Sequence, residues 1–210
     1  MSAAIKKAAE NAATAAGKPA ENLSLAPRAR QFQDIVGATE VTDRGAIRLD
    51  LEQNLARLVR ALKDLRAQGG RLYIVGNGGS AGVAAHAVTD FLNVAKLKAF
   101  TLHEPSLLSC MSNDYGYDVA FARILSTVAS AGDMLIAVSS SGQSLNIRNA
   151  ADEMRKLGGN VVTLSGFKRD NPLRSLGDTN FWLDSADYGM VEIGHQFLLH
   201  NVADRLRMGM

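Results

Sequence analysis

The sequence predicts an α/β fold: a doubly wound parallel sheet of five strands with an added N-terminal helical region. Five short apolar runs alternate with longer segments of helical spacing, which is typical of a parallel sheet covered by helices on both faces. Two of the runs end in segments rich in Gly or Ser, at the sheet edge where such folds bind ligands. The 210 residues are enough for one such domain with a sizeable core.

Composition narrows the classes of function. Hydrophobic residues make up 47% of the chain and charged residues 21%, as in ordinary globular proteins, and the formal net charge of +2 indicates no polyanionic partner. Cys110 is the only cysteine, so no disulfide forms within the chain and a reducing compartment fits. Apolar runs fall short of the roughly 18–20 residues that span a bilayer. We therefore expect a cytoplasmic protein with neither a membrane nor a nucleic-acid partner.

We interpret residues 1–45 as an N-terminal arm, partly helical or loosely ordered, and residues 46–210 as the main domain. Met1–Ala16 is rich in alanine, which favours a helix, and Gly17-Lys18-Pro19 ends it. The main domain begins with an amphipathic helix expected over Ile47–Leu65, whose apolar stripe must pack on the domain or on a partner. The stripe consists of Ile47, Leu51, Leu55, Leu58, Val59, Leu62 and Leu65.

The first strand of the sheet, Leu72–Val75, leads into the Gly-rich segment Gly76–Ser80 and then into a helix expected over Ala81–Ala95. Glycines allow the backbone to approach a polar ligand closely, and a helix N-terminus attracts anions. The glycine pattern also matches a relaxed dinucleotide fingerprint, with Glu104 after the next strand in the place of the ribose-binding acid. A dinucleotide enzyme is therefore one alternative.

The third strand, Met134–Ala137, leads into the Ser-rich segment Ser139–Ser144 and a helix expected over Leu145–Leu157. Four hydroxyls and a flexible Gly142 thus lie where a strand ends and a helix begins. One serine would be an ordinary helix cap, but four in six residues exceed what a cap needs. We interpret this segment as an anion cradle, with phosphate as its natural guest.

The remaining elements complete the sheet. A strand over Ala99–Leu102 precedes the polar turn Ser112–Tyr117 and a helix over Val119–Ala129, and two further strands lie at Asn160–Ser165 and Phe181–Leu183. Right-handed crossovers would place helices on both faces.

Two helices carry candidate chemical groups. His86 and Asp90 lie four residues apart, on one face of the helix that starts at the Gly-rich segment. The closing helix, expected over Met190–Arg207, has one polar line made of Glu192, Gln196 and His200. We interpret the adjacent His195 as a core histidine held by a carbonyl group.

Four segments occur in order: G-N-G-G-S at Gly76–Ser80, S-N-D-Y-G-Y at Ser112–Tyr117, S-S-S-G-Q-S at Ser139–Ser144 and V-E-x-x-H-x-x-x-x-H at Val191–His200. Together they resemble the sugar isomerase (SIS) family, and most closely its sedoheptulose-7-phosphate isomerases, or phosphoheptose isomerases. The resemblance covers roughly residues 47–207.

The resemblance implies a flavodoxin-like SIS fold, a homotetramer with active sites shared between subunits, and aldose–ketose isomerisation of a sugar phosphate. The expected reaction converts sedoheptulose 7-phosphate to glycero-manno-heptose 7-phosphate, for the heptose of lipopolysaccharide or capsule. One base takes a proton from carbon, and one acid polarises or protonates the oxygens of an enediol-like intermediate. We expect the tetramer to be built partly on the helix over Ile47–Leu65.

Carried over by position, the resemblance also implies roles for individual residues. The general base falls on Asp90 and the general acid on His200. Phosphate is expected on Ser139, Ser140, Ser141 and Ser144, and the sugar on Asn77, Gly78, Gly79, Ser80, Asn113, Asp114 and Glu192. A zinc ion is expected on His86, Asp90, Glu192 and His200, and no nucleotide cofactor is implied.

Two residues depart from the pattern of the family. Asp90 stands where the family uses Glu, which is one methylene longer, and Glu192 replaces a common Gln and adds a negative charge that favours a cation. A side branch with a different sugar phosphate would account for both. A non-catalytic SIS module that binds a sugar phosphate or a protein is the second alternative; Asp90 favours it and the retained His200 speaks against it.

Overall fold

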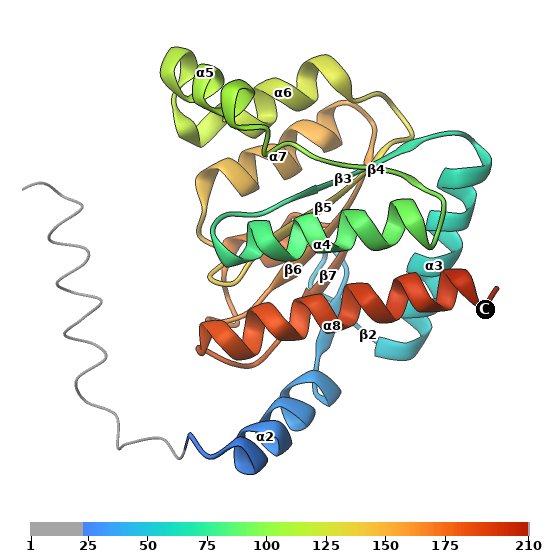
Figure 1. Cartoon of the computed structure of the whole chain (residues 1–210), viewed down its shortest axis with the longest axis vertical. Coiled ribbons are helices and arrows are strands. Elements are labelled where there is room, and N and C mark those ends of the chain that lie inside the picture. The colour runs from blue at the N-terminus through green and yellow to red at the C-terminus, as the bar shows by residue number, and fades with distance from the viewer. Residues whose placement is uncertain (1–22, 210) are drawn as a thin grey trace, which may run out of the picture. The chain divides into compact units, whose positions relative to one another are not determined.

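The structure is a computed structural model that describes residues 23–209, and it has the predicted α/β architecture (Figure 1). The chain divides after Asp34 into two units, and the second of them contains the sheet. The helix α2 (Leu25–Gly37) begins in the first unit. The helix expected over Met1–Ala16 lies outside the described residues, and the domain boundary placed at residue 45 stays a prediction.

The described residues form a seven-stranded sheet in the order β2-β1-β7-β6-β5-β3-β4. Its five parallel strands confirm the predicted sheet, and their spatial order, second-first-third-fourth-fifth along the chain, is the flavodoxin-like one. The parallel strands are β3 (Arg71–Val75), β4 (Lys98–Thr101), β5 (Met134–Ser139), β6 (Asn160–Ser165) and β7 (Thr179–Trp182).

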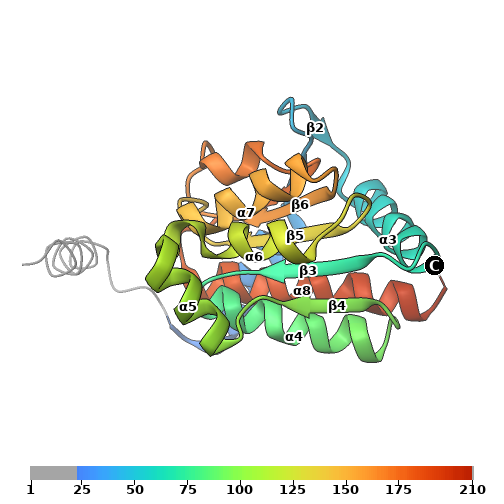
Figure 2. The same cartoon turned by 90° about the horizontal axis from the view of Figure 1, so that it is seen from above.

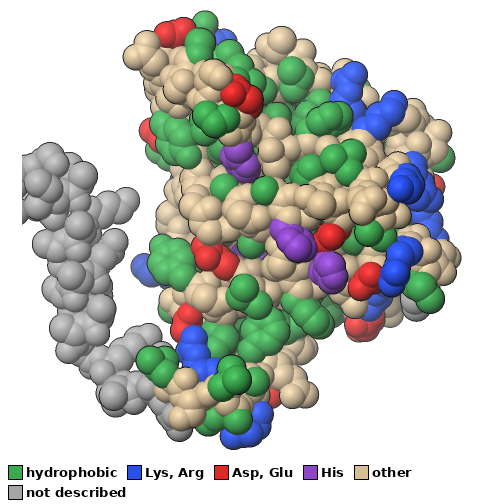
Figure 3. Space-filling view, in the orientation of Figure 1, with side chains coloured by type: hydrophobic (Ala, Val, Ile, Leu, Met, Phe, Trp, Pro, Cys, Tyr) green, Lys and Arg blue, Asp and Glu red, His purple; other side chains and the backbone are tan. Residues whose placement is uncertain are grey.

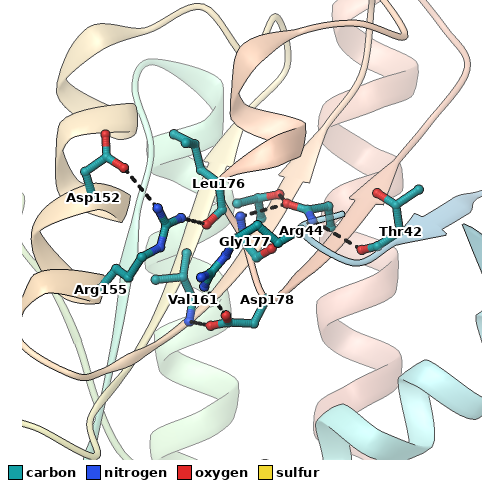
Figure 4. Close-up of polar contacts among 10 residues, drawn as sticks. Thr42, Arg44, Asp152, Arg155, Val161, Leu176, Gly177 and Asp178 are labelled. Carbon is teal, nitrogen blue, oxygen red and sulfur yellow. Dashed lines mark hydrogen bonds and ion pairs between the residues drawn. The ribbon is translucent and has the colours of Figure 1, made fainter. Parts of the chain in front are cut away.

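Two further strands, β1 (Glu40–Thr42) and β2 (Arg48–Leu49), form an antiparallel hairpin that extends the sheet beyond β7. The sequence pattern did not indicate them, because three and two residues are too few to show an alternation. Asp178 holds the hairpin to the sheet: its carboxylate accepts hydrogen bonds from the backbone N–H of Val161 at 2.9 Å and from the guanidinium of Arg44 (Figure 4).

Helices cover both faces of the sheet (Figures 1 and 2). Successive strand residues point to opposite faces, so Leu72 and Ile74 join the core beneath α3, α4 and α8, whereas Tyr73 and Val75 join the core beneath α6 and α7. In the described residues, no helix combines the length and the apolar character needed to cross a membrane. The helices after the hairpin are α3 (Leu51–Ala67), α4 (Gly79–Asn93), α5 (Pro105–Tyr115), α6 (Ala120–Val128), α7 (Leu145–Lys156) and α8 (Tyr188–Arg207), with short 3-10 turns η1 (Tyr117–Val119) and η2 (Pro172–Ser175).

The leading helix α3 begins later than predicted. Asp50 caps it by accepting a hydrogen bond from the N–H of Gln53 at 2.8 Å, and Ile47, which is 63% exposed, precedes β2 and lies outside the helix. The strands and helices of the same chain cover the stripe, so its burial needs no second subunit, and the expectation that a tetramer is built partly on this helix stays a prediction. The buried stripe residues are Leu55, Leu58, Val59, Leu62 and Leu65.

The segment Ser112–Tyr117, expected as a polar turn, is largely the end of helix α5. The carboxylate of Glu104 starts this helix by accepting hydrogen bonds from the N–H groups of Ser106 at 3.1 Å and Leu107 at 2.6 Å. The hydroxyl of Ser106 also donates to this carboxylate at 2.7 Å, and that hydrogen bond, followed by the two from backbone N–H groups, lowers the pKa of Glu104. Glu104 thus acts as a helix cap, which weighs against the ribose-binding role in the dinucleotide alternative.

Candidate active site

The loops after β3 and β5 border a cavity of about 230 Å³ at the carboxyl edge of the sheet. These two strands are neighbours, and the strand order reverses between them, which is where open α/β sheets bind ligands. Nearly all the predicted substrate-binding residues line the cavity, and Tyr188 joins them as a residue that the sequence did not indicate. The lining consists of Asn77, Gly78, Gly79, Ser80, Ser139, Ser140, Ser141, Ser144, Tyr188 and Glu192.

The Ser-rich loop does not use its side-chain hydroxyls to cap the helix that follows it. Ser144 occupies the cap position of α7, but its side chain makes no capping hydrogen bond. The Oγ of Ser140 is buried without a hydrogen-bond partner among the described residues. A buried hydroxyl without a partner is costly unless a ligand satisfies it. The geometry therefore favours an anion cradle over a simple cap.

Gly142 gives the loop its turn. Its φ is +65°, and the side chain of Asn171 lies where a Cβ would project, so only glycine fits. The amide of Asn171 in turn donates hydrogen bonds to the Oγ of Ser165 at 3.2 Å and to the carbonyl of Gly166 at 3.1 Å. Asn171 is thus a supporting residue of the cradle that carried no sequence signal.

The carboxylate of Glu192 lies against the N-terminus of α4, so close that a Cβ on Gly79 would collide with it. Gly78, with φ of +54°, precedes the helix and provides no side-chain cap. A carboxylate is favourable at this positive helix end. Because the Glu192 carboxylate already occupies this helix end, the Ser-rich loop is the part of the cavity that remains for an anion.

Asn77 connects the Gly-rich loop to α7. Its side-chain amide exchanges two hydrogen bonds of 2.9 Å with the amide of Asn146, and its oxygen also accepts one from the hydroxyl of Tyr117 at 2.7 Å. Asn146 is the second residue of the helix predicted over Leu145–Leu157 and gave no signal in the sequence. Asn113 and Asp114 do not line the cavity: they are exposed on α5, where the Asn113 amide donates to Asp114 at 3.1 Å.

A second group of polar side chains lies farther along the same helices. The Oδ2 of Asp90 is 2.7 Å from Nδ1 of His200 and 3.5 Å from Nε2 of His86. The Asp90 side chain is 13% exposed, whereas both imidazoles are more than half exposed. Figure 3 shows histidine side chains side by side, with acidic side chains near them, on the face where α4 and α8 lie.

This cluster, His86, Asp90 and His200, has the donors of a metal site. One ligand atom from each residue lies within 4.8 Å of the others. Two imidazoles and one carboxylate suit zinc with a coordination position left open for substrate. Glu192, predicted as a fourth ligand, is not in the cluster: it is eight residues before His200, about 12 Å along the helix axis.

The other two histidines are buried more deeply. His195 is fully buried, its Nε2 lies 3.1 Å from the carbonyl oxygen of Ser165, and burial lowers its pKa to about 4, which confirms the interpretation as a core histidine. His103, which the sequence analysis left aside, follows β4 with Nε2 at 2.9 Å from the carbonyl oxygen of Gly76. Burial also lowers the pKa of His103. In the sequence, the only indication that His103 lies near the site was its position directly after a predicted strand.

The strand order and the cavity at the switch point define a flavodoxin-like α/β protein with a polar ligand site. A family model for the SIS domain matches residues 41–166. The chain belongs to the SIS-domain family, and its curated relatives there are phosphoheptose isomerases. The one from Pelobacter propionicus is 31% identical over 161 residues, 74% of this chain and 85% of the relative; the one from Geobacter sp. strain M21 is 32% identical over 165 residues, 76% of this chain and 85% of the relative.

Solved structures show the same fold. The phosphoheptose isomerase of Neisseria gonorrhoeae matches with a TM-score of 0.74 and 23% identity, over 86% of this chain and 94% of that one. The phosphoheptose isomerase of Francisella tularensis also gives 0.74, with 22% identity over 85% of this chain and 92% of that one. The expected family and fold class are therefore confirmed.

Proposed function

We propose that the protein is an aldose–ketose isomerase of a sugar phosphate, with sedoheptulose 7-phosphate as substrate. One observation carries the proposal: the cavity that contains the Ser-rich loop lies at one end of the adjacent helices α4 and α8, and the Asp90–His200 pair lies farther along them. The curated relatives named phosphoheptose isomerase support the same reaction.

The two centres suit a long sugar chain. Glu192, at the cavity, and His200, at the cluster, are about 12 Å apart along the axis of α8. With C–C bonds of about 1.5 Å, an extended seven-carbon chain with its phosphate spans roughly 10 Å. With phosphate on the Ser-rich loop, an extended chain would direct carbons 1 and 2 toward the cluster. Binding energy from the phosphate then holds the reacting carbons in place.

Proton transfer is the task of the cluster. Nδ1 of His200 is hydrogen-bonded to Asp90, so Nε2 of His200 is available to donate a proton to a substrate oxygen. The second carboxylate oxygen of Asp90 is the candidate to take the proton from carbon. The same three residues, His86, Asp90 and His200, would hold a zinc ion in place of the hydrogen bond between Asp90 and His200, and zinc would then supply the polarisation of the carbonyl. Metal analysis of protein purified without chelator should find zinc in the wild type and less in His86→Ala.

The test is isomerisation of sedoheptulose 7-phosphate in deuterated water, followed by proton NMR. The wild type should form an aldose heptose 7-phosphate and incorporate deuterium at carbon 1 or 2. No product and no exchange with sugar phosphates of five to eight carbons would overturn the proposal in favour of a non-catalytic binding module.

A further inference from the structure

A second cavity, of about 400 Å³, lies between the β1–β2 hairpin and the loop that follows β6. Its lining residues include Arg48, Arg169 and Arg174, together with Glu40 and Asp170. Three arginines and two acidic residues thus border one cavity. None of these residues belongs to the candidate active site.

Two of the arginines are held in place by Glu40. Its carboxylate accepts hydrogen bonds from Arg169 and, at 2.8 Å, from Arg174. The hydrogen bond from Arg169, followed by Arg174, lowers the pKa of Glu40 to about 2, so this carboxylate is charged at neutral pH. Arg174 also lies over the ring of Trp182, 4.7 Å from its centroid, and only 11% of its side chain is exposed.

The other guanidinium groups remain accessible. The guanidinium group of Arg48 has no hydrogen-bond or ion-pair partner among the described residues, and 66% of the Arg169 side chain is exposed although it binds Glu40. Guanidinium groups present paired N–H donors that match the oxygens of a phosphate. The cavity volume lies in the range of small-molecule sites and exceeds what inorganic phosphate fills.

We propose that this arginine pocket binds a small phosphorylated metabolite through Arg48 and Arg169, separately from the Ser-rich cavity. The loop that walls the pocket also supports the anion cradle: the N–H of Gly166 donates to the carbonyl of Ser140 at 2.9 Å, and the N–H of Leu173 donates to that of Gly142 at 3.3 Å. A ligand in the pocket would therefore rest on the segment that holds the cradle.

Trp182 offers a local readout, because it is the only tryptophan of the chain and both Arg169 and Arg174 lie over its ring. Titration with glucose 6-phosphate at constant ionic strength should change its fluorescence in a saturable way, whereas glucose should not. Arg48→Ala should weaken the apparent affinity about tenfold or more, because it removes charge-assisted hydrogen bonds. Glu40→Gln should strengthen it, because the competing carboxylate is lost.

Two matched variants complete the experiment. Arg60→Ala removes an exposed arginine from α3, and Ser141→Ala alters the other cavity; both should leave the titration unchanged. The proposal is overturned if no saturable change occurs, or if the change survives Arg48→Ala and disappears in Ser141→Ala. Circular dichroism verifies that each variant folds. The readout needs no turnover, so its failure would leave the proposed isomerase intact.

Discussion

Asp90 is the residue on which the proposed chemistry depends. Its carboxylate meets His200 at 2.7 Å, although it is one methylene shorter than the Glu that the family pattern has at this position. The short arm therefore does not prevent the pair from forming. It does require the reacting carbon to approach closer to α4, because a displacement of about 1 Å can cost roughly 100-fold in rate.

Asp90→Asn should abolish exchange of the substrate's carbon-bound proton with deuterium and leave substrate binding largely intact. The amide keeps the shape of the side chain but cannot take up a proton at neutral pH. We expect a loss of at least about 100-fold, the lower range for general base catalysis. Proton NMR measures the exchange, and calorimetry measures the binding.

Asp90→Glu distinguishes two origins of the shorter side chain. If the cavity is adapted to Asp, the longer side chain should lower the rate. If the site is a heptose phosphate site that has lost activity through the change from Glu to Asp, the longer side chain should raise the rate. Asp204→Asn, a change at a half-exposed side chain on α8, is the control. Undiminished exchange in Asp90→Asn would remove this residue from the mechanism.

Ser141→Ala should weaken binding of sedoheptulose 7-phosphate and leave binding of unphosphorylated sedoheptulose unchanged. The variant removes one hydroxyl donor from the cradle, and a hydrogen bond to a charged phosphate contributes about 1.5–3 kcal/mol. Calorimetry with both ligands, and with Ser126→Ala as control, measures the difference. Equal affinity of the wild type and Ser141→Ala for the phosphorylated sugar would contradict the assignment.

At the scale of elements, the closing helix α8 joins the site to the core. Its outer residues Glu192 and His200 serve the site, while His195 points into the protein and meets the carbonyl of Ser165 at the end of β6. The polar line was visible in the sequence. The sequence did not show that Glu192 and His200 lie in two separate centres, because spacing along a helix does not reveal which residue of a neighbouring element each side chain contacts.

The burial of His195 makes stability depend on pH. Burial lowers its pKa from 6.5 to about 4 in the folded state, so the unfolded chain takes up the proton first as the pH falls. The stabilisation is present above pH 6.5 and is lost as the pH falls toward 4. From about 1.4 kcal/mol per pKa unit, we expect a loss of roughly 2 kcal/mol between pH 7.5 and pH 5.

Urea denaturation of the wild type and of His195→Gln at these two pH values measures this effect. The pH dependence should be smaller in the variant by that amount, whatever its absolute stability. His103 also has a lowered pKa and titrates in both proteins, so the difference isolates His195. An identical pH dependence in both proteins would show that His195 is not the group responsible.

At the scale of the whole molecule, the predicted tetramer needs a surface other than the stripe of α3. The helices that carry the candidate site expose apolar side chains: Ile193 on α8 is 59% exposed and Leu92 on α4 is 46% exposed. We expect light scattering to report a tetramer for the wild type. Ile193→Glu should shift it toward smaller species, because a charge in an apolar interface is costly.

Lys156→Glu, an exposed change on α7, is the control for that experiment and should leave the assembly unchanged. A wild-type monomer at micromolar concentration would contradict the predicted tetramer.

The sequence by itself determined the five parallel strands, the helices α4, α6 and α7 between them and the two loops at the carboxyl edge, but not helix α5. Apolar runs, helical periodicity and clusters of Gly and Ser are local signals, so they can be read without knowing contacts. It also placed His86, Asp90 and His200 among the candidates, through spacing and resemblance. Parallel strands bring their loops to one edge, which is why those loops meet in the structure.

Only the tertiary structure decided the contacts between distant segments. It added the β1–β2 hairpin, placed Glu192 against Gly79 rather than beside His200, and left Asn113 exposed on a helix. It also buried the stripe of α3 within one chain and positioned Asn171 behind the cradle. Each of these depends on the direction in which a side chain leaves its own element and on what another element offers there, and the spacing of residues along the chain specifies neither.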